Sequence, residues 1–193
     1  PDAYEFIKKD IYPCLKDIIS TYKKGTDFSI YMDTDGLIHA GSGLDQVTWM
    51  DVRVGDWVAT PRHGKPVEIN ALWYNALCTM DMLQAKFGDN DDSYRQLASL
   101  VKTSFNKRFW NENTGCLYDV VDEDDDTIRP NQIYAVSLPF TMLDKEREKA
   151  IVDTVTDKLY VGCGLRSLDP DHKDYHPIYI GSLSKRDHAY HQG

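Results

Sequence analysis

The spacing of apolar residues predicts a chain built mainly from helices. Residues 3–24 carry apolar side chains from Phe6 to Tyr22 at helical intervals, and Pro13 is expected to kink this helix without ending it. Pro66 is well placed in the first turn of a second helix, and Asp144 is a good cap for the last one. The further helices are predicted over residues 66–87, 92–109, 131–143 and 144–160.

Short extended segments separate these helices. The stretch FSIYMDTDGLIHAG alternates like a hairpin that turns at Asp35-Gly36, and a polar loop with one short extended piece follows the third helix. Glycine-led segments recur after helices, at 36–39, 115–119 and 164–168. Helix pairs with elaborate loops at one end are typical of a toroid, of which this chain would supply about half. We therefore expect residues 1–193 to be a partial domain, truncated at both ends.

Composition and charge narrow the class of protein. The net charge of −9 and the absence of a basic stripe argue against nucleic-acid binding, and they fit a neutral or cationic substrate. No stretch of about 18 apolar residues is present, so a membrane span is not expected. Cys14, Cys78, Cys116 and Cys163 form no CxxC pair, and we expect them to be buried and reduced in a cytoplasmic protein.

The loop at residues 46–70, QVTWMDVRVGDWVATPRHGKPVEIN, contains the first candidate chemistry. Trp49 and Met50 place apolar groups next to Asp51. Apolar neighbours raise the pKa of a carboxyl group, as a general acid requires, and an indole offers a flat face to a sugar ring. The alternative is that Trp49 belongs to the core and Asp51 caps a turn.

The same loop continues with polar groups that allow two interpretations. Arg62 and Lys65 could donate hydrogen bonds to sugar hydroxyls or could pair with nearby aspartates to fix the loop. Glu68 could favour the helix macrodipole, or it could share a wet inner stripe with Asn75, which lies on the same helical face. A solvated outer face would show the same pattern.

Later segments add further candidates. Asn131 and Gln132 could face a pocket or satisfy a helix end. Arg166 lies in a C-terminal region rich in tyrosine and histidine, which could bind carbohydrate or could be a long loop that merely packs its own rings. The acidic run 122–126 lacks the glycine and distal glutamate of an EF-hand loop, so we expect a solvated loop. No HExxH or His-Cys set supports metal chemistry.

Five ordered motifs carry a resemblance to a known family. VTWMD, VGDWVATPRHGKPVEINALWYNAL, RPNQIYAVSLP, GLRSLDPDHKDYH and RDHAYHQG resemble the C-terminal domain of glycogen debranching enzymes, the amylo-α-1,6-glucosidase domain. The resemblance extends from about residue 28 to the end of the chain. It implies part of a mainly α, (α/α)6 toroid of the six-hairpin glycosidase type, with short β-hairpins in the loops.

The resemblance also implies an activity and its residues. The expected reaction is hydrolysis of α-1,6-glucosidic branch linkages in glycogen or limit dextrin with inversion, with Asp51 as general acid. The general base is expected beyond Gly193, and no metal or organic cofactor is expected. Pocket candidates that match family motifs are Trp49, Arg62, Lys65, Glu68, Asn131, Gln132, Arg166, His191 and Gln192.

Two alternatives stay open at the level of sequence. A non-catalytic carbohydrate-binding or scaffold toroid would keep the fold without the chemistry. Another toroidal glycosidase, such as an α-glucosidase or a trehalase-like enzyme, would use similar loops on a different linkage. For the favoured interpretation the partners are a branched α-glucan and the remainder of the parent chain, in the cytoplasm.

We predict that the 193-residue chain by itself hydrolyses nothing at a useful rate, because an inverting hydrolase needs a second carboxylate to activate water. Glucose release from a singly branched limit dextrin by the purified chain measures this. Steady release above the rate without protein would contradict the prediction.

Overall fold

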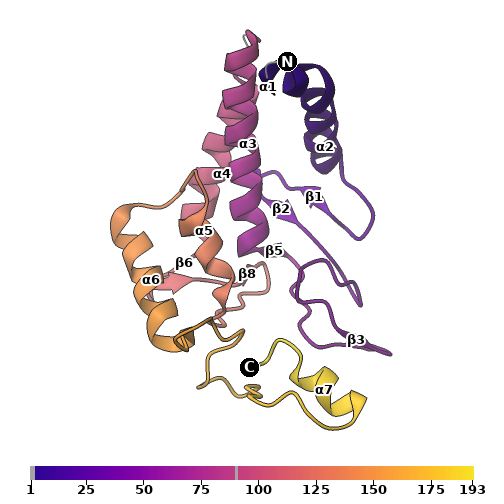
Figure 1. Ribbon diagram of the computed structural model, residues 1–193, viewed down its shortest axis with the longest axis vertical. Coiled ribbons are helices and arrows are strands. Elements are labelled where there is room, and N and C mark those ends of the chain that lie inside the picture. The colour runs from indigo at the N-terminus through magenta and orange to yellow at the C-terminus, as the bar shows by residue number, and fades with distance from the viewer. Residues whose placement is uncertain (1–2, 90) are drawn as a thin grey trace.

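The long helix α3 (Val67–Phe87) is the central element of the computed structural model, which describes residues 3–89 and 91–193 (Figure 1). Helix α2 (Tyr12–Lys24) and helix α4 (Ser93–Arg108) both pack against it. Helix α6 (Lys145–Leu159) contacts the segment that follows residue 129. The loops, the short strands and the C-terminal segment gather at the end of the molecule where α3 begins. The prediction of a mainly helical chain is therefore confirmed.

The predicted N-terminal helix is present, but a π-helical turn interrupts it. The order is α1 (Ala3–Phe6), the π turn η1 (Ile7–Ile11) and α2, with Pro13 in the first turn of α2. Proline lacks an N–H and crowds the carbonyl four residues before it, and a wider turn relieves this conflict. The helical pattern thus changes just before Pro13, the position at which a kink was predicted.

Helices α3 and α4 form the core where they meet. Leu77 of α3 and Val101 and Phe105 of α4 are fully buried, and the Phe105 ring stacks on Phe109 at 4.4 Å. Both helices lie within one residue of their predicted bounds, although Pro66 is the N-cap of α3 and not part of its first turn. Helix α3 is apolar around much of its circumference, as expected of a helix with neighbours on several sides.

Two buried amides on α3 fix neighbouring backbone. The Asn70 side chain accepts from Ile38 N at 2.7 Å and donates to Ile38 O at 3.1 Å. Asn75 makes the same paired contact with Phe140, at 2.9 Å in each direction. Glu68 and Asn75 are both buried, so the solvated outer face considered for this helix is wrong.

The helix predicted over 131–143 is shorter than expected. A 3-10 turn, η2 (Pro130–Ile133), leads into α5 (Tyr134–Ser137), and Leu138 then adopts an extended conformation. The cause is Pro139, because a proline disfavours helical geometry in the residue before it. The next helix, α6, begins as predicted, with the Asp144 side chain accepting a hydrogen bond from Arg147 N at 2.8 Å.

Within the residues that the structure describes, eight two-residue strands form four antiparallel pairs in the loops. The predicted hairpin around Asp35-Gly36 is confirmed as the first pair. The pair β5–β8 joins segments far apart in the sequence and brings residue 65 beside residue 121. The pairs are β1 (Tyr31–Met32) with β2 (Ile38–His39), β3 (Arg53–Val54) with β4 (Trp57–Val58), β5 (Lys65–Pro66) with β8 (Val120–Val121), and β6 (Trp110–Asn111) with β7 (Cys116–Leu117).

The C-terminal region contains a short helix that the pattern did not predict, α7 (Leu183–Ala189), whose N-cap is Ser182. The expectation of four buried cysteines is wrong for Cys14 and Cys163, which are exposed, while Cys116 is buried. All four cysteines are free thiols.

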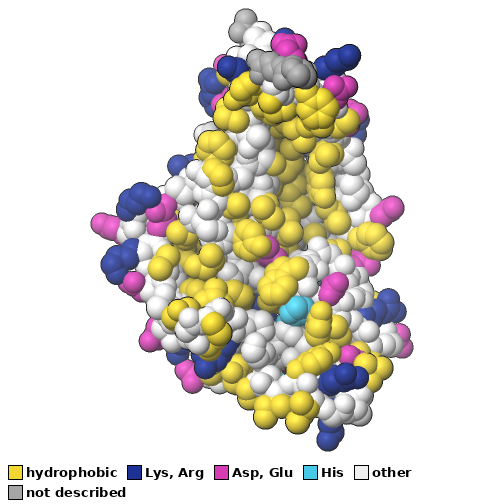
Figure 2. All heavy atoms as spheres, viewed as in Figure 1, with side chains coloured by type: hydrophobic (Ala, Val, Ile, Leu, Met, Phe, Trp, Pro, Cys, Tyr) yellow, Lys and Arg dark blue, Asp and Glu magenta, His cyan; other side chains and the backbone are white. Residues whose placement is uncertain are grey.

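Apolar side chains remain exposed along α2 and α3. Ile18 and Tyr22 of α2 and Leu72 of α3 are each at least 38% exposed, and they border a shallow apolar groove between the two helices. Figure 2 shows apolar side chains gathered over the upper part of the molecule. Among the described helices, none is both long and apolar enough to cross a membrane.

Lys65 is the centre of a salt-bridge cluster that fixes the β1–β2 hairpin. Its side chain is only 2% exposed, and its ammonium group donates to Asp33 at 2.8 Å and to Asp35 at 2.9 Å. Arg108 of α4 bridges Asp35, at 2.7 Å, and Asp122. The hydrogen bond from Lys65 lowers the pKa of Asp33. Partial burial alone would raise the pKa of Asp35, but Lys65 and Arg108 lower it.

The lowered pKa values make stability depend on acid pH. Both carboxylates bind protons more weakly in the folded than in the unfolded protein, so their contribution to stability is complete above about pH 5 and is lost progressively as the pH falls below that value. We predict that Lys65→Met lowers the free energy of unfolding at pH 7 by about 1.5–3 kcal/mol and reduces the additional loss between pH 7 and pH 3. Urea unfolding at the two pH values measures both effects. Lys107→Met, at an exposed position of α4, is the control, and an equal pH dependence in both variants would contradict the prediction.

Candidate active site

The loop at residues 46–66 is shaped by a hairpin and by one obligatory glycine. Strands β3 and β4 form its outer part, and its last residues pair with β8 before α3 begins. Gly64 has a φ of +102°, and a Cβ atom there would lie 2.7 Å from Val121 O. Only glycine tolerates both conditions, so the loop can lie flat against β8.

A buried guanidinium group ties this loop to two other segments. Arg62 contacts both oxygens of Glu68, at 2.5 and 2.6 Å, and both oxygens of Asp119, at 2.5 and 3.1 Å. All three side chains are at most 3% exposed. The planar guanidinium fork suits such paired contacts, which a lysine ammonium could not reproduce. The arrangement joins the loop, the first turn of α3 and the β7–β8 connection.

A second arginine completes the charge balance. Arg129 lies with its Nε 3.9 Å from Asp119 Oδ2, so two arginines face the two carboxylates of Glu68 and Asp119. Full burial raises the pKa of Asp119, while Arg62 and Arg129 act in the opposite direction. Burial alone would lower the pKa of Arg62, but Asp119 and Glu68 raise it. We name these four residues, Arg62, Glu68, Asp119 and Arg129, the buried ionic network.

Asn131 connects the buried ionic network to the surface. Its amide donates to Asp119 Oδ1 at 2.8 Å and accepts from Trp49 Nε1 at 2.9 Å. The Trp49 side chain is nevertheless half exposed, and Met50 beneath it is buried. Asp51 follows and lies exposed, so the carboxylate stands at the surface beside an anchored indole.

The C-terminal segment reaches the same place through Arg129. Its guanidinium donates to His191 O at 2.8 Å and to Gln192 Oε1 at 3.1 Å, and Gln192 also donates to Ala59 O at 3.2 Å. These contacts hold His191 at a φ of +60° with its ring 4.8 Å from that of Trp49. Burial lowers the pKa of His191, whereas the nearby Asp51 carboxylate acts to raise it.

The structure brings together seven of the ten predicted site residues, namely Trp49, Asp51, Arg62, Glu68, Asn131, His191 and Gln192. The other three are engaged elsewhere. Lys65 serves its salt-bridge cluster, and Gln132 accepts from Leu117 N at 3.2 Å and so supports β7. Arg166 donates to the Tyr175 hydroxyl at 3.2 Å.

Sequence reasoning did not select Asp119 and Arg129, which hold the network together. The sequence offers a weak indication that each of them is buried. Asp119 is an acidic residue within the largely apolar run 116–121, and Arg129 precedes the proline that opens η2. A charge in such a position is buried only when it is paired, so both residues could have been proposed as partners.

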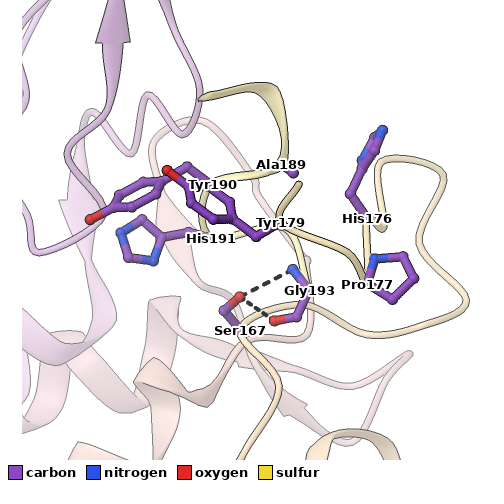
Figure 3. Close-up of a pocket in the computed structure, with 8 residues that line it drawn as sticks. All are labelled: Ser167, His176, Pro177, Tyr179, Ala189, Tyr190, His191 and Gly193. Atoms are coloured by element: carbon purple, nitrogen blue, oxygen red, sulfur yellow. Dashed lines mark hydrogen bonds between the residues drawn. The ribbon is translucent and has the colours of Figure 1, made fainter. Parts of the chain in front are cut away.

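A hollow of about 240 Å³ lies next to this site (Figure 3). The rings of Tyr179, Tyr190 and His191 group on one side, and His176 and Pro177 lie on the other. Below them Ser167 and Gly193 are joined by hydrogen bonds. Within residues 3–89 and 91–193, no group of three or more metal-binding side chains is found.

An exposed carboxylate beside an anchored indole and an imidazole, next to a hollow lined by tyrosines, defines a candidate carbohydrate-active enzyme. Comparison with known families agrees. The chain belongs to the family described as amylo-alpha-1,6-glucosidase, which matches residues 1–193. Membership of this family supports a glycoside hydrolase.

Individual relatives are more distant. A glycogen debranching enzyme of Saccharomyces cerevisiae is 28% identical over 219 residues, covering 88% of this chain and 14% of that protein. The chain thus spans about one seventh of this curated relative. The crystal structure of a GH78 family rhamnosidase of Bacillus sp. GL1 matches with a TM-score of 0.58 at 20% identity, over 80% of this chain and 15% of that one. The latter likeness concerns the fold alone.

We predict that Arg62→Met lowers the free energy of unfolding by about 3–5 kcal/mol, because it leaves two buried carboxylates without their main partner. Arg53→Met is the matched control, since Arg53 is an exposed arginine of the same loop and is expected to cost less than about 1 kcal/mol. Chemical denaturation measures both. Similar losses in the two variants would show that Arg62 does not organise the loop.

Proposed function

We propose that this chain is part of an (α/α)6 toroidal glucosidase domain that hydrolyses α-1,6-glucosidic branch linkages in glycogen or limit dextrin with inversion. The observation that carries the proposal is the placement of Asp51. Its carboxylate stands exposed at the surface while its neighbours Trp49 and Met50 are held from below by Asn131. A rigid support under an accessible acid is what a general acid requires.

Asp51 is the proposed general acid, which protonates the glycosidic oxygen as the bond breaks. Trp49, which is half exposed, offers its indole to the glucosyl ring, and the His191 ring meets the indole edge-to-face at 4.8 Å. Substrate covering these three groups would exclude water and strengthen every polar contact inside the site.

The proposed base lies outside this sequence. Glu68 and Asp119, the other carboxylates of the site, are buried and occupied by Arg62, so neither is free to activate water. An inverting mechanism places the second carboxylate about 6.5–9.5 Å from the acid, with water between them. A carboxylate from further along the parent polypeptide would meet this condition by facing Asp51 across the site.

The toroid is supported by the surface of the helices. Ile18, Tyr22 and Leu72 leave apolar area exposed along α2 and α3, as expected where further helices of the same domain would pack. The loops of α3, α4 and α6 meet at one end, which is where a toroid places its pocket. The cytoplasmic location and the partial domain over 1–193 stay predictions.

We predict that Asp51→Asn in the full-length gene product lowers kcat on a singly branched dextrin by about 100- to 10,000-fold, because the amide cannot donate a proton to the leaving oxygen. Asp56→Asn, at an exposed position of the same loop, is the control and keeps wild-type turnover. Circular dichroism and thermal unfolding verify that both variants fold.

Near-normal turnover in Asp51→Asn would remove Asp51 from its role. Product analysis on panose, trehalose and branched dextrin separates the proposed linkage from those of other toroidal glycosidases. Sugar binding without any hydrolysis by the wild-type gene product would favour the carbohydrate-binding alternative.

A further inference from the structure

A row of aromatic rings leads from the proposed acid into the hollow. The Trp49 and His191 centroids lie 4.8 Å apart, His191 and Tyr190 4.0 Å, and Tyr190 and Tyr179 6.1 Å. Figure 3 shows the last three of these rings together on one side of the hollow. We name Trp49, His191, Tyr190 and Tyr179 the aromatic row. Its outer member, Tyr179, is 51% exposed.

The backbone around the hollow is held firmly. Arg129 donates to Ser167 O at 3.1 Å and to His191 O at 2.8 Å, so one buried guanidinium fixes two of the lining segments. His176 N donates to Gln192 O at 2.6 Å, and the Ser167 hydroxyl donates to Gly193 O at 2.6 Å. The hollow is thus a preformed feature tied to the buried ionic network.

The lining suits one sugar residue better than an apolar ligand. Aromatic faces bind the C–H face of a pyranose, while its hydroxyl groups need hydrogen-bond partners at the edge. His176 lines the hollow and is exposed, so its imidazole can supply such a partner. The volume of about 240 Å³ is at the small end of ligand sites, which fits a single ring with the remaining chain in solvent.

We propose that the hollow and the three rings of the row that line it, His191, Tyr190 and Tyr179, bind a glucosyl residue of the chain that leaves when the branch linkage is cut, while Trp49 faces the glucosyl ring that is released. This inference rests on the proposed function and adds a binding site for the leaving chain, a part of the substrate that the proposed role of Asp51 does not specify. The Asp51 carboxylate is near enough to His191 to act on the pKa of its imidazole, so the row passes close to the group that protonates the leaving oxygen. Tyr179 is the proposed specificity residue, since it is the exposed outer member of the row.

The test compares a substrate with a sugar leaving group against one without. In the full-length gene product, kcat/KM is measured on a singly branched dextrin and on α-glucosyl fluoride, whose leaving group is fluoride. We expect the ratio of the two values to fall about tenfold in Tyr179→Ala and less than twofold in Tyr179→Phe, which keeps the ring. Tyr160→Ala is the control, since Tyr160 is 52% exposed and is not among the residues that line the hollow, and it should leave the ratio unchanged.

The outcomes separate this inference from the proposed function. An unchanged ratio in Tyr179→Ala, or an equal loss on both substrates, would overturn the inference while branch cleavage by the wild type would still support the function. Cleavage of neither substrate by the wild type would reject the function. In that case, the binding of maltotriose, measured by tryptophan fluorescence, tests whether the hollow is a sugar subsite. Loss of binding in Tyr179→Ala supports the subsite, and absence of binding in the wild type rejects it.

Discussion

The paired contacts of Arg62 with Glu68 and Asp119 are the constraint on which the rest of the site depends. Removing charges from water is costly, and here the cost is offset because each carboxylate is met by a guanidinium group in good geometry. With Arg129 the network contains two positive and two negative groups, so no net charge is buried. Each member comes from a different segment, which makes the network the point where the loop, α3, β8, η2 and the C-terminal residues are joined.

The buried ionic network positions Trp49 and His191 at the surface through a few hydrogen bonds. Asn131 is hydrogen-bonded both to Asp119 and to the Trp49 indole, and Arg129 donates a hydrogen bond to the backbone carbonyl of His191. Asp51 itself is exposed, while Trp49 and His191 near it are held by these contacts. The interior of this region is therefore held by paired charges, while the Asp51 side chain remains accessible.

The ionic groups of this chain serve two separate purposes. The Lys65 cluster fixes a hairpin against α4 and β8, and its contribution to stability varies with pH because Lys65 lowers the pKa of Asp33 and Asp35. The buried ionic network is shielded from solvent and supports the candidate active site. Arg62 and Lys65 are close in sequence, but Arg62 belongs to the buried ionic network and Lys65 to the salt-bridge cluster, because the chain between them turns at Gly64.

The sequence by itself determined the helical framework, the first hairpin and the family motifs, since apolar spacing, Asp144 and Asp35-Gly36 act through local backbone geometry. It also placed Asp51, Trp49 and Arg62 in one loop. Only the tertiary structure decided that Lys65 and Gln132 support the fold, that Asp119 and Arg129 complete the site, and that Tyr179 lies on a row leading from Trp49. These roles depend on partners many residues away, and local patterns do not encode which distant charges or rings will meet.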